Sequence, residues 1–236
     1  MGHHSAGRLI LEPQEGFRVF SFREHLLEGK VIDRPNRFLV NVQTVEGPLE
    51  CHLHDPGRLK ELIYPGNSVL YRPTNGVRTS HSVTAALDSG QWILTDTRIH
   101  SAVASTFLPA DVEREVGVGR HRIDFRHGDT LIEVKGCTML KGNIATFPDA
   151  PTKRGREHLE LLRKHALEGK RAVIMILTFR KDAESFQPNE ETDPAFAEEF
   201  MLALRDGVEC FIPRFSFEEG TLVYRGNIRP AGRFKP

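Results

Sequence analysis

The feature that most constrains the fold of this 236-residue chain is a hairpin pattern near its middle. Two strand-like runs flank a glycine-containing turn, and they cover Arg120–Arg126 and Thr130–Lys135. If Gly128-Asp129 forms a two-residue loop, counting back along the paired strands places Asp124 opposite Glu133. A three-residue loop would shift the pairing and could turn Asp124 to the other face.

Carboxylates that face each other across a hairpin, with Cβ atoms about 5 Å apart, repel. A divalent cation removes this repulsion, and Mg²⁺ or Mn²⁺ prefers oxygen ligands. Lys135 shares the face of Glu133 because side chains alternate along a strand, and it would orient a water or stabilise charge on a phosphate. The pattern predicts a catalytic set of Asp124, Glu133 and Lys135. Asp124 and Glu133 are the expected Mg²⁺ or Mn²⁺ ligands, and Glu115 is a candidate for a further carboxylate.

The Glu-x-Lys pattern is weak by itself, because it occurs twice more in the chain. Glu28-Gly29-Lys30 and Glu168-Gly169-Lys170 both match it. Each lies at an apparent element end, where Lys and Gly commonly terminate helices. Only Glu133-Val134-Lys135 falls inside an apolar strand that follows an aspartate on a paired strand. Without a cation, the same residues would be a structural defect.

Composition narrows the class of protein. Apolar residues make up 39 % and charged residues 27 % of the chain, as in soluble globular proteins. No run is long enough to span a bilayer, and we expect a cytoplasmic protein with no membrane contact. The three cysteines show no zinc spacing and fit a reducing compartment. The net charge is zero, so the overall charge does not indicate a nucleic-acid partner.

The charge is nevertheless sectored along the chain. Residues 151–171 contain seven Lys or Arg and three Glu, and the tail adds Arg225, Arg229, Arg233 and Lys235 without an acid. Local basic patches can contact phosphates, although such runs are more often solvated faces. The candidate phosphate contacts on this segment are Lys153, Arg154, Arg156 and His158. His158 has a second interpretation as a packed polar residue. Asp149 could reach the carboxylate site from the start of the helix, or it could only cap that helix.

The first part of the chain is rich in strand signals. Alternation over Arg37–Thr44, returning strands at Leu49–His54 and Ser68–Arg72, and a short helix at Arg58–Ile63 predict a small Greek-key barrel such as an OB-fold. An open β-meander is the alternative. Here Arg34, Arg37 and Arg58 could bind nucleic acid around Phe38 as an aromatic platform. Phe38 on an alternating strand is more often a core residue.

Beyond about residue 109 the pattern changes to mixed helix and strand. We expect helices at Arg98–Phe107, Thr152–Leu167 and Pro194–Arg205, and strands at Ala172–Phe179, Val208–Phe215 and Thr221–Tyr224. The predicted fold class is α/β, α+β overall. An OB-like barrel over residues 1–108 precedes a restriction-endonuclease-like α/β domain over residues 109–236.

This order of elements resembles the PD-(D/E)xK nuclease core, and the whole chain resembles the sugar fermentation stimulation protein (SfsA) family. The segments that carry the resemblance are Arg34–Val40, Pro56–Leu62 with Pro65-Gly66, Glu115–Phe125, Ile132–Gly136 and Phe147–Leu159. The sequence departs from the family pattern at Asp55 and His100, where asparagine is usual. The stretch Arg78–Ser82 also lacks an expected lysine and aromatic residue.

The resemblance implies a non-sequence-specific DNA-binding protein, with a divalent-metal-dependent nuclease site that hydrolyses phosphodiester bonds. The alternative is a DNA-binding regulator of sugar metabolism that keeps the nuclease scaffold without cleavage. The expected partner is DNA, with single-stranded DNA or RNA left open. The oligomeric state is also open, a homodimer included.

Overall fold

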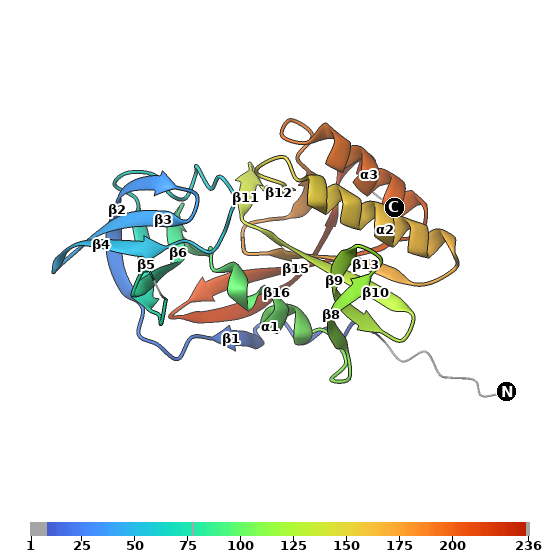
Figure 1. Ribbon diagram of the computed structural model, residues 1–236, viewed down its shortest axis with the longest axis horizontal. Coiled ribbons are helices and arrows are strands. Elements are labelled where there is room, and N and C mark those ends of the chain that lie inside the picture. Colours follow the sequence, from blue (N-terminus) through green and yellow to red (C-terminus); the bar gives the residue numbers. More distant parts are fainter. Residues whose placement is uncertain (1–8, 77, 235–236) are drawn as a thin grey trace.

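The computed structural model describes residues 9–76 and 78–234. It has two parts side by side: a barrel built from the first half of the chain, and a mixed sheet covered by helices (Figure 1). The predicted α+β class with an N-terminal OB-like barrel is confirmed. Among the described residues, no helix combines the length and the apolar character that crossing a membrane requires.

The barrel has five strands that close on themselves. They are β2 (Leu27–Asn36), β3 (Leu39–Thr44), β4 (Gly47–His52), β5 (Ser68–Pro73) and β6 (His81–Asp88). The order β6-β4-β3-β2-β5 is completed by pairing of β5 with β6. Alternation along β3 sends Val40 and Val42 into the barrel core, where both are fully buried. Closure excludes the open meander.

Two local predictions in the barrel are wrong. The predicted helix at residues 58–63 is a single turn, in which the Ile63 amide donates to the Leu59 carbonyl at 2.8 Å. Phe38 precedes β3 and is 45 % exposed, so the alternation of that strand does not bury it. Gly29 also lies inside β2 rather than at a helix end.

The second part is built on a sheet around β13 (Ala172–Thr178). This strand is buried along its whole length, and it runs parallel to both of its neighbours, β10 (Thr130–Cys137) and β15 (Glu209–Glu218). The sheet continues through β9 and β8 on one side and β16 on the other. The remaining strands are β1 (Arg18–Ser21), β7 (Gln91–Leu94), β8 (Glu113–Val118), β9 (His121–His127), β11 (Met139–Lys141), β12 (Ile144–Phe147), β14 (Ser185–Pro188) and β16 (Thr221–Pro230).

Helices cover the two faces of this sheet. α2 (Lys153–Leu167) and α3 (Pro194–Arg205) pack on one face, and α1 (His100–Ser105), which follows η1 (Thr97–Ile99), packs on the other. Alternation along β13 supplies both cores: Val173 and Met175 point to the α1 side, and Ile174 and Ile176 to the α2 side. A short η2 (Gly232–Phe234) ends the described chain, and Lys235 of the predicted basic tail lies outside it.

α2 begins where the sequence predicted, but its cap is not Asp149. Thr152 caps the helix by accepting from the Gly155 amide at 3.1 Å. Asp149, the predicted cap, instead accepts from the Leu59 amide in the barrel at 3.0 Å. The segment before α2 is therefore a contact between the two parts of the molecule.

Packing also crosses the predicted division at residues 108 and 109. β1 pairs with β16, and α1 packs on β10 and β13, so both lie with the C-terminal sheet. β7 pairs with β6 of the barrel and with β15 of the sheet. The division into residues 1–108 and 109–236 remains a prediction. These contacts show that β1, β7 and α1, which precede residue 109, pack on the C-terminal sheet.

Candidate nuclease-type site

The hairpin that carries the predicted carboxylates has the short loop. Thr130 pairs with His127, and Ile132 pairs with Phe125. The next pair in this register is Glu133 with Asp124, as counting from a two-residue turn predicts. Gly128 supports the turn with φ of +56°, a left-handed conformation that favours glycine.

Glu133 is held rigidly below α2. Its side chain is 2 % exposed, and its Oε1 accepts hydrogen bonds from Lys135 Nζ and from His158 Nδ1, both at 2.5 Å. Its other oxygen, Oε2, is buried and has no hydrogen-bond partner among the described residues. A buried carboxylate oxygen without a partner is costly, and such a group in a folded protein calls for an explanation.

Asp124 lies on the adjacent strand β9, and its Oδ2 accepts from the Val134 amide at 2.7 Å. Burial and the charge of Glu133 together raise the pKa of Asp124 to about 6, despite that hydrogen bond and the charge of Lys135. The pKa of Glu133 moves the other way. Burial would raise it, but the hydrogen bond from His158 and the charge of Lys135 outweigh burial and lower it. The two neighbouring carboxyl groups thus interact unfavourably and are stabilised unequally.

Glu115 is the least enclosed of the predicted carboxylates. In the register of β8 with β9, Arg114 pairs with Phe125 and Val116 with Ile123, so Glu115 lies opposite Asp124. The charge of Glu115 helps to raise the pKa of Asp124. Its backbone has φ of +53°, and its carboxylate lies 3.8 Å from Arg122 in an exposed ion pair. Glu115 therefore borders the carboxylates of Asp124 and Glu133 from the surface.

The donor set suits a hard cation. Among residues 9–76 and 78–234, no group of three or more His, Cys, Asp or Glu side chains forms a ready-made metal cage. Two carboxylates with a free buried oxygen instead match the way Mg²⁺ is bound, through one or two carboxylates with retained waters and substrate oxygens. The residues present fit such an ion.

The predicted α2 residues divide into two groups. His158 is buried and touches Glu133, and its Nε2 accepts from Arg154 Nε at 3.4 Å. Lys153 is exposed and lies 3.8 Å from Glu157, and Arg156 lies 3.7 Å from Glu160. His158 therefore belongs to the carboxylate site, whereas the others lie on the surface of the helix near its start.

The predicted barrel residues also differ in their surroundings. The guanidinium of Arg34 donates to the carbonyls of Arg37 at 2.9 Å, Gly57 at 2.8 Å and Arg58, and so holds the chain around the turn at residues 57–63. Arg37 and Arg58 are exposed. Arg37 stands 5.8 Å from the centre of the Phe38 ring, a cation–π contact.

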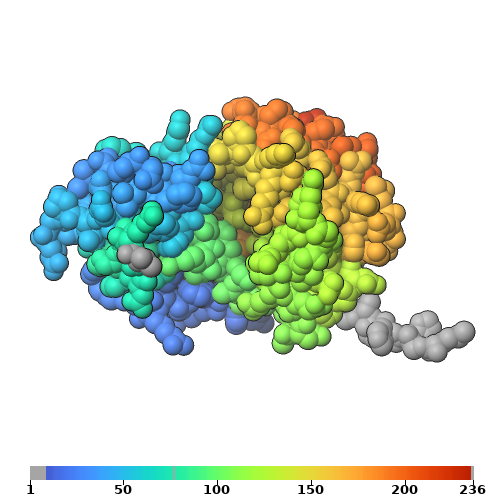
Figure 2. Space-filling view, in the orientation of Figure 1, coloured from blue at the N-terminus to red at the C-terminus, as the bar shows by residue number. Residues whose placement is uncertain are grey.

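Several residues that were not predicted from the sequence lie around the ring of Phe38. Two adjoining hollows on the barrel are lined in part by His52, His54, Arg78 and Arg98. The alternating histidines of Cys51-His-Leu-His54 were the available signal, because they stand between buried Cys51 and Leu53. Figure 2 shows the surface hollowed between the blue-to-cyan barrel and the yellow segment around residue 150.

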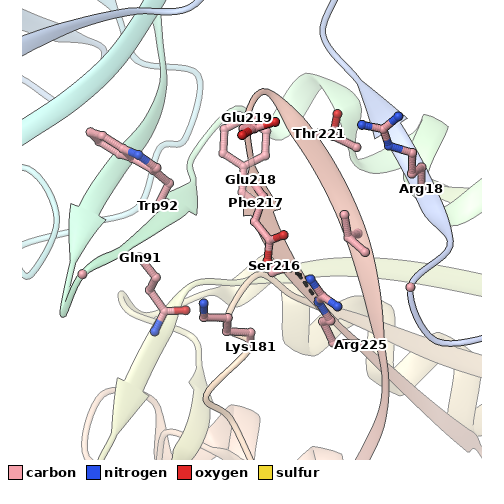
Figure 3. A pocket seen from close by; sticks show the side chains of 13 residues that line it. Arg18, Gln91, Trp92, Lys181, Ser216, Phe217, Glu218, Glu219, Thr221 and Arg225 are labelled. Carbon is pink, nitrogen blue, oxygen red and sulfur yellow. Dashed lines mark hydrogen bonds and ion pairs between the residues drawn. The ribbon is translucent and has the colours of Figure 1, made fainter.

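A larger pocket than these two hollows lies elsewhere in the described structure. It has a volume of about 750 Å³ and lies along β15 and β16 next to Trp92 and Lys181 (Figure 3). Arg225, on its floor, already donates to Ser216 and to Glu218, each at 2.8 Å. None of the predicted site residues lines it.

Comparison with known proteins identifies the relatives of the chain. Residues 91–221 match the family described as "Sugar fermentation stimulation protein RE domain", and residues 32–95 match "SfsA N-terminal OB domain". A sugar fermentation stimulation protein homolog of Saccharolobus solfataricus is 50 % identical over 215 residues, covering 91 % of this chain and 90 % of the relative. A homolog of Thermoplasma volcanium is 50 % identical over 203 residues, covering 86 % and 94 %.

A solved structure agrees over almost the whole length. Pyrococcus furiosus SfsA, determined in complex with Ca²⁺, superposes with a TM-score of 0.84 at 27 % identity, covering 92 % of this chain and all of that one. Both parts of the fold are included in these matches. The chain therefore belongs to the sugar fermentation stimulation protein (SfsA) family.

Proposed function

We propose that this protein binds DNA without sequence specificity and hydrolyses phosphodiester bonds at Asp124, Glu133 and Lys135 with Mg²⁺ or Mn²⁺. The observation that carries the proposal is the buried, unpartnered Oε2 of Glu133 beside a second, half-buried carboxyl group, Asp124. A cation bound there would supply the missing partner and relieve the repulsion between the two carboxylates.

Asp124 and Glu133 are the residues that would hold the ion, and Glu115 borders them. When bound, such a cation stabilises negative charge on a phosphate and makes an attacking water more acidic. The Ca²⁺ in the Pyrococcus furiosus relative supports the proposal, since Ca²⁺ is also a hard cation with oxygen ligands.

Lys135 and His158 complete the site, and both contact the same oxygen of Glu133. Lys135 Nζ, bonded to Glu133 Oε1, is placed to neutralise charge that builds on a phosphate oxygen during hydrolysis. His158 donates through Nδ1 to the same oxygen and fixes the direction of Oε2. The contact of Arg154 Nε with Nε2 of His158 helps to hold the ring in this orientation.

The start of α2 is the proposed contact for the nucleic-acid backbone. Lys153 and Arg154 are exposed in the first turn of this helix, where the backbone dipole also favours anions. Their contacts would be independent of base identity, which matches binding without sequence preference.

A cleavage assay with Mg²⁺ or Mn²⁺ over single-stranded DNA, duplex DNA and RNA tests the proposal. We expect the parent to cut at least one form, and Glu133→Gln to abolish cleavage. Lys135→Met should slow it by about 10²–10³-fold, as removal of a charge-stabilising donor does. Glu113→Gln is the matched control, because this carboxylate on neighbouring β8 is exposed and paired with Arg126.

Binding must be measured on the same variants. Asp124→Asn removes a negative charge, so affinity for nucleic acid should hold or rise while cleavage fails. A parent that binds DNA but cuts none of the three forms with either metal would refute the nuclease proposal. The site would then be the retained scaffold of a DNA-binding regulator.

A further inference from the structure

Three aromatic rings form a line on the outer surface of the barrel. The rings of Phe38 and His52 are parallel within 3°, with centres 6.2 Å apart, and the rings of His52 and His54 have centres 4.2 Å apart. Phe38 is 45 % exposed, although a phenylalanine beside an alternating strand is usually buried. We call Phe38, His52 and His54 the ring strip.

Two adjoining hollows follow the ring strip, with volumes of about 580 Å³ around Phe38 and about 530 Å³ around His54. They share His52, Arg78 and Thr79. The hollows are therefore one extended groove rather than two separate pockets.

The groove is basic, although the chain as a whole is neutral. Three arginines line it, Arg37, Arg78 and Arg98, and Glu50 is the single acid among the described residues that do so. Arg98 is anchored by two hydrogen bonds to the buried carboxylate of Asp96, at 2.9 and 2.7 Å, which fixes its position.

The rings contribute surface rather than charge. Burial lowers the pKa of His54 to about 4, with Arg98 and His52 adding to the effect and Asp96 opposing it. His54 is therefore a neutral ring at physiological pH, suited to stacking. The groove thus combines flat rings with three arginine side chains.

From this pattern we infer that the groove on the barrel binds single-stranded nucleic acid, with bases stacked on the ring strip and phosphates beside Arg37, Arg78 and Arg98. Stacking needs exposed base faces, which a single strand offers and a duplex keeps within its own stack. The mixture of rings and cations is the chemistry that such a strand requires.

A short series of contacts connects the groove with the strand that carries Lys135. Arg98 lies two residues before His100, whose ring packs so closely on Gly136 that an added Cβ there would be 2.2 Å from it. Gly136 directly follows Lys135. The inference rests on the proposed function only in taking the bound strand as the substrate of that site; binding itself needs no cation.

Fluorescence anisotropy with a labelled oligothymidylate of about 12 nucleotides, in EDTA, measures this binding without cleavage. We expect the parent to bind the single strand more tightly than a duplex of the same length. Phe38→Ala should weaken single-strand binding about tenfold or more and leave duplex binding unchanged. The matched control is Tyr64→Ala, an aromatic residue that is 46 % exposed on the same barrel and lines neither hollow.

The inference is overturned if the parent prefers the duplex, or if Phe38→Ala and Tyr64→Ala lower single-strand affinity equally. His52→Ala provides a second test, and we expect it to lower the affinity for the single strand as well. Failure here leaves the nuclease proposal untouched, because Glu133→Gln cleavage tests that separately. If the parent cleaves no nucleic acid, the anisotropy result still tests binding by the groove, because that measurement does not depend on cleavage.

Discussion

At the scale of single residues, the candidate site shows how different surroundings give two carboxyl groups different pKa values. Glu133 is a buried and Asp124 a half-buried carboxyl group on paired strands, yet the pKa of Asp124 rises to about 6 and that of Glu133 falls. The difference lies in the partners, because Lys135 and His158 both donate to Glu133, whereas Asp124 receives one backbone amide.

The sequence could predict this pairing because a two-residue turn fixes which residues face each other. It could not predict that His158 reaches Glu133, since that contact depends on how α2 docks on the sheet. It also could not predict the exposure of Phe38. That residue falls just before the strand, where alternation no longer decides the face.

A first prediction concerns His100. Burial lowers the pKa of its ring from 6.5 to about 4, the charge of Lys135 adds to this effect, and the charge of Asp96 opposes it. Below pH 6.5 the unfolded chain binds a proton that the folded chain resists, so His100 should cost stability as pH falls from 6.5 to 4. Over that interval His100→Asn should lose less stability than the parent, by roughly 1–3 kcal/mol. Urea unfolding at pH 7 and pH 4.5 measures the difference, and equal losses would contradict the assignment.

At the scale of elements, strand β2 depends on a glycine at the centre of its pairing. Gly29 lies opposite Val69 of β5, and a Cβ built on it would be 2.5 Å from Val42 Cγ1 and 2.9 Å from the Gln43 carbonyl oxygen of β3. The sequence suggested an element end at this position. Only the pairing of β2 on both edges explains why a side chain is excluded there.

Gly29→Ala should therefore destabilise the barrel by about 1–3 kcal/mol, because backbone atoms of β3 must move. Gly117→Ala on β8 is the control, since a Cβ there meets nothing within 4 Å. Urea midpoints of the two variants make the comparison. Equal stability of Gly29→Ala and the parent would show that the strands are less tightly paired than described.

At the scale of the whole molecule, a few polar contacts join the barrel to the sheet. Asp149 reaches the Leu59 amide, and the buried guanidinium of Arg180 contacts Asp88 of β6 at 2.5 Å. The fold class and many of the larger elements followed from the sequence, whereas strands β1, β2, β11, β12 and β14 were not predicted. These contacts did not follow from the sequence, because nothing local marks a residue as the partner of another part of the fold.

Net charge is also a property of the whole chain, and it is zero, so any affinity for phosphates must come from local patches. If Arg154 touches a phosphate, Arg154→Ala should flatten the slope of log affinity against log salt by about 0.7–0.9. Arg233→Ala should change it less, since Arg233 is paired with Glu190. Equal slopes for the parent and Arg154→Ala would remove the start of α2 from the binding surface.

The most direct test of the account is to locate the cation. Crystals soaked in Mn²⁺ should give an anomalous difference peak between the carboxylates of Asp124 and Glu133, with Glu133 Oε2 among its ligands. The peak should vanish in Glu133→Gln and persist in the control Glu113→Gln. A peak only at another position, or an unchanged peak in Glu133→Gln, would contradict the assignment of these two residues as the metal-binding pair.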